Sequence, residues 1–129
     1  MHSPAPDCRF CIENNLLTDT PLYKNAAFYV LGMLDPKRAK AVMVVPFEHS
    51  VTPFEISGEA FSHLADALAF VKSHLAQFEP DGFTIGWNVG EAAGQTVFHS
   101  HMHVICRFRG ESAEGHGLAG LLRLVNQTG

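Results

Sequence analysis

Three histidines occupy alternate positions in one short stretch of the chain, GQTVFHSHMHVICRF at 94–108. Successive side chains of a β-strand point to opposite faces, so His99, His101 and His103 would share one face if this stretch is extended. Imidazole rings gathered in this way can bind a metal ion or act as nucleophiles. Because such a row of titratable rings serves no packing purpose, the spacing indicates a chemical site.

A single metal ion cannot bind all three histidines. Along a strand that rises about 3.3 Å per residue, His99 and His103 lie roughly 13 Å apart. A histidine nitrogen binds zinc at about 2 Å, so the two outer rings cannot reach one ion. At least one of the three must therefore have another task.

The loop that precedes the histidines, NVGEAAGQT at 88–96, suggests that task. Gly90 and Gly94 permit a tight turn with exposed backbone N–H groups. Asn88, Gln95 and Thr96 add neutral hydrogen-bond donors that suit phosphate oxygens. An imidazole beside a phosphate can attack phosphorus, because its ordinary pKa of about 6.5 leaves it mostly unprotonated at neutral pH.

The rest of the chain supplies the elements that must position these residues. Apolar residues at intervals of three and four between 57 and 82 predict one long amphipathic helix, with Ser57 as N-cap and Pro80 beyond its end. Runs rich in β-branched and aromatic residues predict strands at 26–34, 41–47, 83–89 and 99–108, and a short strand within 18–24. Strands that follow one another around a single inserted helix are typical of the α+β class.

Length and composition fit one domain covering residues 1–129. The chain has 129 residues and 47% hydrophobic residues, enough for one core and too few for two. We predict an antiparallel sheet of about five strands with one main helix, and a loose C-terminal tail at 110–129, where glycine and serine are frequent.

Charge and cysteine content restrict the classes of partner. A net charge of −4 offers no basic surface for nucleic acid, and no apolar run is long enough to span a membrane. The three cysteines, two of them spaced as Cys8-x-x-Cys11, fit a reducing compartment. We therefore expect a cytoplasmic protein that binds neither nucleic acid nor membranes.

The residues from Asn88 to His103 form a recognisable motif. The pattern N-x-G-x-x-A-G-Q-T-x-x-H-x-H-x-H resembles the signature of the histidine-triad nucleotide hydrolases and transferases, and the likeness of layout covers all but about the last twenty residues. The resemblance implies a nucleotide-binding α+β domain that pairs as a homodimer.

The resemblance also implies roles for individual residues. The triad histidines His99, His101 and His103 form the catalytic group, in which His101 attacks the α-phosphorus and His103 helps to hold the phosphate. Contacts to phosphate oxygens or to the leaving group fall on Asn88, Gln95 and Thr96, and Gly94 allows close backbone approach. Phe10 and Phe28 would sandwich a nucleobase, and the carboxylate of Asp35 is a candidate acceptor for ribose hydroxyls.

A structural zinc site is a second expectation. Cys8 and Cys11 supply half of a tetrahedral site, and two histidines commonly supply the other half. Zinc-containing relatives in the resembled family use a histidine after the strand-end proline turn and the first triad histidine, which correspond here to His49 and His99. Residues 1–20 would then form a zinc-knuckle-like segment tied to the sheet.

The pattern departs from the family at one point. Many relatives carry Gly-His where this chain has Lys40 and Ala41, so one active-site histidine is absent. The preferred reading remains a hydrolase that cleaves at the α-phosphate of a nucleoside phosphoramidate or dinucleoside polyphosphate through a nucleotidyl-histidine intermediate.

Three alternatives stay open at this point. A nucleotidyl transferase would pass the adduct to a phosphate or sulfate acceptor, which product analysis with and without acceptor distinguishes. A nucleotide-binding interaction module would bind tightly with little turnover. A metalloenzyme with triad histidines as catalytic ligands would lose activity on chelation while its fold survives.

Overall fold

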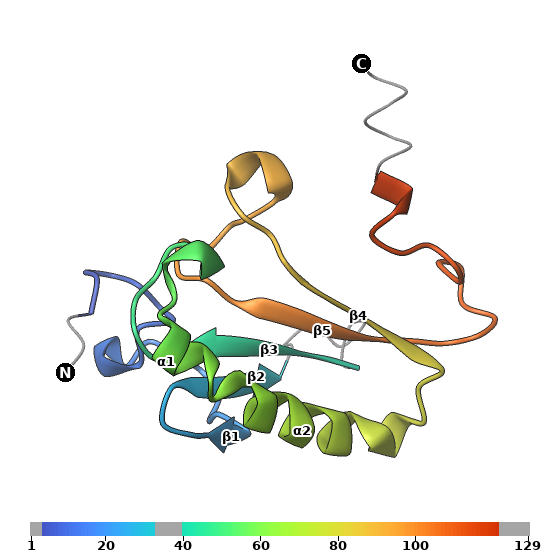
Figure 1. The fold of residues 1–129 in the computed structure, drawn as a ribbon, viewed down its shortest axis with the longest axis horizontal. Helices are drawn as coiled ribbons and strands as arrows, with labels where there is room; N and C mark the ends of the chain where they lie inside the picture. The colour runs from blue at the N-terminus through green and yellow to red at the C-terminus, as the bar shows by residue number, and fades with distance from the viewer. Residues whose placement is uncertain (1–3, 33–39, 122–129) are drawn as a thin grey trace.

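The computed structural model describes residues 4–32 and 40–121. Five strands form one antiparallel sheet in the order β1-β2-β3-β5-β4, and two helices cover one of its faces (Figure 1). The strands are β1 Tyr23–Lys24, β2 Phe28–Gly32, β3 Ala41–Pro46, β4 Gly82–Trp87 and β5 Met102–Arg107. The helices are α1 Gly58–Phe61 and α2 Leu64–Leu75, with 3-10 turns at Ile12–Asn14, Pro53–Glu55, Ala76–Phe78 and Glu91–Ala93. The predicted α+β class and sheet are confirmed.

The predicted long helix is divided into two. Ser57 is the N-cap as expected, since its side chain accepts from the Ala60 amide at 3.1 Å. The helix breaks between α1 and α2, where the Ser62 hydroxyl donates to the Glu59 carbonyl at 2.6 Å. At the same junction Asn25 donates to the carbonyl of His63 at 3.0 Å, which ties the break to the turn before β2. Side-chain bonds to backbone groups compete with helix continuation in this way.

The main core lies between α2 and the sheet. Met102, Val104 and Cys106 alternate on β5 and pack with Val71 and Leu75 of α2. All five side chains are at most 4% exposed, since alternate residues of a strand share one face. The opposite face of β5 is therefore available for the site.

A second, smaller core lies on the other face of the sheet. Phe10 from the N-terminal segment packs on Tyr29, Leu31 and Val45, and the Tyr29 hydroxyl donates to the Phe10 carbonyl. Burial raises the pKa of Tyr29, so this hydroxyl stays a donor at neutral pH. The N-terminal segment is thereby fixed against the strands that neighbour the triad.

Strand β5 is shorter than predicted, which corrects the expectation of a strand at 99–108. It begins at Met102, so His99 and His101 lie in the segment that leads into it. The Ser100 amide donates to the Ser50 carbonyl at 2.6 Å, and the two serine hydroxyls are 3.1 Å apart. This part of the chain thus pairs with the turn after β3 instead of extending the strand ladder.

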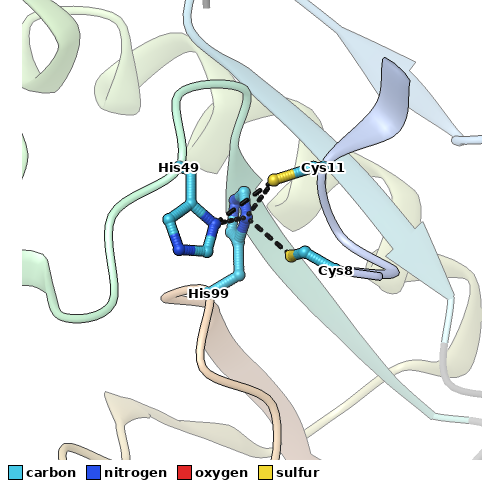
Figure 2. Close-up of side chains that lie close together, drawn as sticks. All are labelled: Cys8, Cys11, His49 and His99. Atoms are coloured by element: carbon cyan, nitrogen blue, oxygen red, sulfur yellow. Dashed lines mark hydrogen bonds between the residues drawn. The ribbon is translucent and has the colours of Figure 1, made fainter. Parts of the chain in front are cut away.

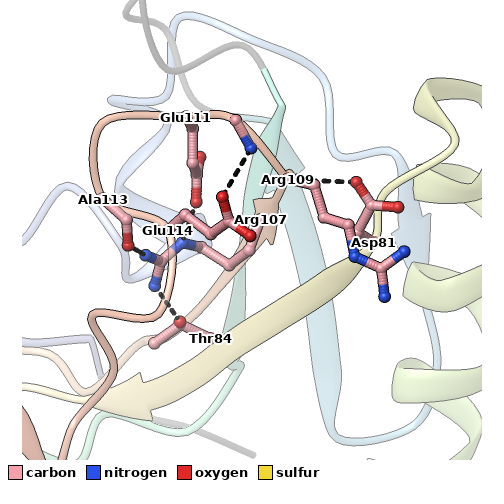
Figure 3. Close-up of polar contacts among 8 residues, drawn as sticks. Asp81, Thr84, Arg107, Arg109, Glu111, Ala113 and Glu114 are labelled. Atoms are coloured by element: carbon pink, nitrogen blue, oxygen red, sulfur yellow. Dashed lines mark hydrogen bonds and ion pairs between the residues drawn. The ribbon is translucent and has the colours of Figure 1, made fainter.

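The C-terminal segment returns along β4 and β5. Arg107 forms an ion pair with Glu111 at 2.6 Å, donates to Thr84 at 2.7 Å, and donates to the Ala113 carbonyl (Figure 3). The Arg109 amide donates to Asp81 at 2.8 Å. These contacts hold the described start of the segment that was predicted to be loose; residues 122–129 lie outside the described ranges. Within the described ranges, no helix is long and apolar enough to cross a bilayer.

Candidate functional site

Four potential metal ligands converge where the N-terminal segment meets the sheet. The thiols of Cys8 and Cys11 face the rings of His49 and His99 (Figure 2). Their ligand atoms all lie within 4.8 Å of one another. Both cysteines precede the first 3-10 turn, with Cys11 at its N-cap, while His49 follows β3 and His99 precedes β5.

The spacing of these atoms fits a metal ion with tetrahedral coordination. Cys11 Sγ lies 3.2 Å from His49 Nδ1 and 3.5 Å from His99 Nδ1, and the two histidine nitrogens are 3.2 Å apart. Cys8 Sγ lies 3.5 Å from His99 Nδ1. For zinc bound at about 2.3 Å to sulfur and about 2.0–2.1 Å to nitrogen, tetrahedral angles require N–N and N–S separations of about 3.4 and 3.6 Å. The cluster can therefore bind a metal ion, and its donor set is one that zinc takes.

His99 is oriented for this task by a second contact. Its Nε2–H donates to the Pro46 carbonyl at 2.7 Å, which leaves the Nδ1 lone pair directed into the cluster. The side chain is fully buried, and burial lowers the pKa of His99 to about 4. Burial also raises the pKa of Cys11 to about 11. Metal binding must therefore displace a proton from that thiol.

The ring of His101 is oriented by a hydrogen bond to the backbone. Its Nδ1–H donates to the His99 carbonyl at 2.8 Å, so the lone pair lies on Nε2. The edge-on ring of Phe10 and the ring of His103 each lie 5.0 Å from it, centre to centre. Burial lowers the pKa of His101, and the positive charge of Arg9 lowers it further. The ring is consequently neutral at physiological pH, as nucleophilic attack requires.

The loop that precedes the triad in the sequence carries exposed donors. Gly94 adopts φ 95°, a left-handed conformation that favours glycine, and the Asn88 amide nitrogen lies 3.9 Å from where a Cβ on Gly94 would be. Asn88, Gly94 and Thr96 are all exposed. They are accessible to a ligand.

Gln95 is placed differently from the other loop residues. It is 4% exposed, its Oε1 accepts from the Gly90 amide at 2.8 Å, and its Nε2 donates to the carbonyls of Val51 and Val97 at 2.7 and 3.1 Å. All of its amide hydrogens are thus used within the protein. In this structure Gln95 shapes the loop instead of presenting a free donor to phosphate.

Phe10 and Phe28 are not brought together. Phe28 is buried with Val30 in the core beneath the helices, whereas Phe10 packs on Tyr29 across the sheet. Residues 28 and 29 alternate between the two faces, so no sandwich of the two rings around a base can form. This corrects the expected base-binding pair. Asp35 lies outside the described residues.

A small cavity lies beside the triad on the Phe10 side of the sheet. Its volume is about 170 Å³, and it is lined by Arg9, Leu16, Leu17, Thr18, Asp19, Leu31, Gly32 and Met43. Met43 is the register partner of both Leu31 on β2 and His103 on β5, which places the cavity one strand from His103. No sequence pattern predicted the cavity, because its walls come from segments that are far apart along the chain.

Comparison with known families decides the relationship. A family model described as the HIT domain matches residues 15–110. The chain belongs to the HIT family. The matched range contains the phosphate-suited loop, His49 and all three triad histidines, and excludes the Cys8–Cys11 pair.

Individual HIT proteins support the assignment. "Protein hit" of Bacillus subtilis is 32% identical over 108 residues, covering 81% of this chain and 73% of the relative. Adenosine 5'-monophosphoramidase hnt1 of Schizosaccharomyces pombe is 32% identical over 113 residues, covering 85% and 81%. A zinc-bound histidine triad family protein from Mycobacterium smegmatis shares the fold, with a TM-score of 0.70, 24% identity, and coverage of 94% and 97%.

The buried state of His99 predicts how acid destabilises the metal-free protein. Its folded pKa, about 4, is below the ordinary 6.5, so His99 contributes stability above pH 6.5 that is lost as the pH falls towards 4. His101 adds in the same direction. We expect the free energy of unfolding in urea to fall by about 2–3 kcal/mol over this range on account of His99. The exposed control His116→Asn should keep the wild-type slope and His99→Asn should flatten it; equal slopes in all three proteins would contradict the account.

Proposed function

We propose that this HIT protein is a nucleotide hydrolase that cleaves at the α-phosphate of a nucleoside phosphoramidate or dinucleoside polyphosphate. The observation that carries the proposal is the hydrogen bond from His101 Nδ1 to the His99 carbonyl. It fixes the tautomer in which Nε2 holds the lone pair, and the loop that precedes the triad carries exposed donors. A relative that is 32% identical is named an adenosine 5'-monophosphoramidase, which supports the same chemistry.

The reaction proceeds in two displacements. His101 Nε2 attacks the α-phosphorus and forms a P–N bond, while the bond from phosphorus to the leaving amine or phosphate breaks and the leaving group takes the electron pair and a proton. Water then attacks the phosphorus, the P–N bond returns its electrons to the ring, and a nucleoside monophosphate is released. Splitting the reaction in this way replaces one difficult step with two easier ones.

The remaining site residues stabilise the charge on phosphorus. Exposed Asn88 and Thr96 and the backbone at Gly94 donate to the phosphoryl oxygens, and His103 lies beside His101 to hold the same group. His99 acts indirectly, since its carbonyl orients the nucleophile. Gln95 is a positioning residue that keeps the loop in place through Gly90 and Val51.

Loss of the nucleophile should abolish turnover. We expect His101→Ala to lower kcat for adenosine 5'-phosphoramidate, guanosine 5'-phosphoramidate and diadenosine polyphosphate by at least about 1000-fold, because His101 Nε2 is the atom that forms the P–N bond in the proposed mechanism. Release of nucleoside monophosphate measures this, and added phosphate or sulfate reveals any transfer product. His74→Asn, on the helix α2 away from the site, is the control. Wild-type turnover in His101→Ala would exclude the proposed mechanism.

We infer that zinc occupies the Cys8, Cys11, His49 and His99 cluster. Support comes from the tetrahedral spacing of the ligand atoms and from the similarly folded, zinc-bound Mycobacterium smegmatis protein. The ion would hold the N-terminal segment against the two segments that carry the histidines, and so stabilise the surroundings of His101 without joining the reaction.

Metal analysis tests the zinc site. We expect about one zinc ion per purified chain, and less than about a tenth of that in Cys8→Ser, with a lower Tm in the variant because the ion's binding energy contributes to folding. Cys106→Ser is the matched control, since Cys106 is buried in the helix-side core. Zinc retained at full occupancy by Cys8→Ser would refute the assignment.

We also infer a homodimer formed through the edge strand β4. Phe83 and Ile85 on this strand are 38% and 43% exposed, and with Leu68 and Val71 they line an apolar cavity of about 360 Å³. An open edge bearing apolar side chains favours pairing with another strand, and a second copy pairs symmetrically across a two-fold axis.

Sedimentation distinguishes the dimer from a monomer. The wild type should sediment at twice the 14.1 kDa of one chain, and Ile85→Glu should sediment as a monomer because it introduces a charge into the apolar contact. Phe54→Glu, a control at a residue that is 85% exposed elsewhere, should remain dimeric. A monomeric wild type would remove this part of the proposal.

A further inference from the structure

The cavity beside the triad carries two opposite charges that do not neutralise each other. Arg9 and Asp19 both line it and both are exposed. Within residues 4–32 and 40–121, neither side chain forms an ion pair. Each therefore keeps its hydrogen-bonding capacity for a ligand in the cavity.

The guanidinium of Arg9 packs over the face of the Phe10 ring. Its central carbon lies 5.0 Å from the centre of the Phe10 ring, and that ring contacts His101 edge-on, with centres 5.0 Å apart. A guanidinium over an aromatic ring is stabilised by the cation–π interaction. This contact restricts the position of Arg9, with the Phe10 ring between it and His101, while leaving its five N–H donors available.

The cavity has room for one part of a nucleotide. Its volume of about 170 Å³ is below the range of roughly 300–1,000 Å³ that encloses a whole small molecule. Leu17, Leu31 and Met43 give it apolar walls suited to a flat ring. A base seated here would place its sugar towards His103 and its α-phosphate towards His101.

Resting on the proposed function, we propose that Arg9 and Asp19 select guanine as the base of the substrate. Guanine presents two acceptors, O6 and N7, that match the forked donors of an arginine. Its N1–H and N2–H₂ groups are donors on the neighbouring edge, which match a carboxylate. Adenine has a donor in place of O6, which faces the donors of Arg9, and an acceptor at N1, which faces the carboxylate of Asp19. It therefore matches neither side chain.

The test compares guanosine and adenosine 5'-phosphoramidates as substrates of the full-length protein. We expect kcat/KM to favour guanosine by about tenfold or more, because a good bidentate pair is worth about 1–3 kcal/mol of discrimination. Arg9→Gln and Asp19→Asn should each bring the ratio close to one, mainly through KM. Arg109→Gln and Glu13→Gln, charge changes outside the cavity, should keep the wild-type ratio.

A further variant and a further substrate distinguish base recognition from other roles of Arg9 and Asp19. Arg9→Lys keeps the positive charge but lacks the fork, so it should also lose the preference. Inosine 5'-phosphoramidate lacks the N2 amine, so the wild type should turn it over less efficiently than guanosine 5'-phosphoramidate. Asp19→Asn should turn over the two substrates equally well. A wild type that favours adenosine or treats both bases alike would overturn the inference. Equal losses for both bases in the variants would overturn it as well, since Arg9 would then contact phosphate and Asp19 the ribose.

Failure of the hydrolase proposal is distinguishable from failure of this inference. If no nucleotide is turned over, calorimetry with GMP and AMP measures base preference directly. Tighter binding of GMP, lost in Asp19→Asn, would support the guanine pocket without catalysis. Equal affinity for the two nucleotides would contradict it.

Discussion

The arrangement of the site depends on the fixed position of His99. One ring nitrogen donates to the carbonyl of Pro46 at the end of β3, and the other faces Cys8, Cys11 and His49. Three segments distant in sequence therefore meet at one buried side chain. The His99 backbone extends the same constraint, because its carbonyl accepts from His101 and so sets the tautomer of the next triad residue.

The three histidines consequently have different surroundings. His99 belongs to the metal-binding cluster, His101 has a free Nε2 lone pair, and His103 lies on β5 beside the small cavity. Alternation along an extended chain places all three on one side, yet their partners differ because each neighbours a different segment. The cluster of potential metal ligands and the proposed nucleophile are therefore separate sites on one stretch of backbone.

The sequence was sufficient for features encoded by local pattern. Runs of β-branched and aromatic residues predicted the strands of the sheet, and the Cys8-x-x-Cys11 pair together with the family resemblance predicted the metal cluster. The sequence did not predict contacts between residues that lie in distant segments of the chain. The early end of the strand ladder follows from the Ser50–Ser100 pairing, and the burial of Gln95 follows from its bonds to Val51. Phe10 and Phe28 were paired by resemblance, although the alternation on β2 places them on opposite faces.

Peptide mapping of the trapped reaction intermediate tests the division of the triad most directly. Wild-type protein would be mixed with guanosine or adenosine 5'-phosphoramidate, quenched without acid, digested, and analysed by mass spectrometry for a nucleotidyl group. We expect the group on His101 and none on His99, whose ring nitrogens are both engaged. A nucleotidyl group on His99 or His103 would contradict it.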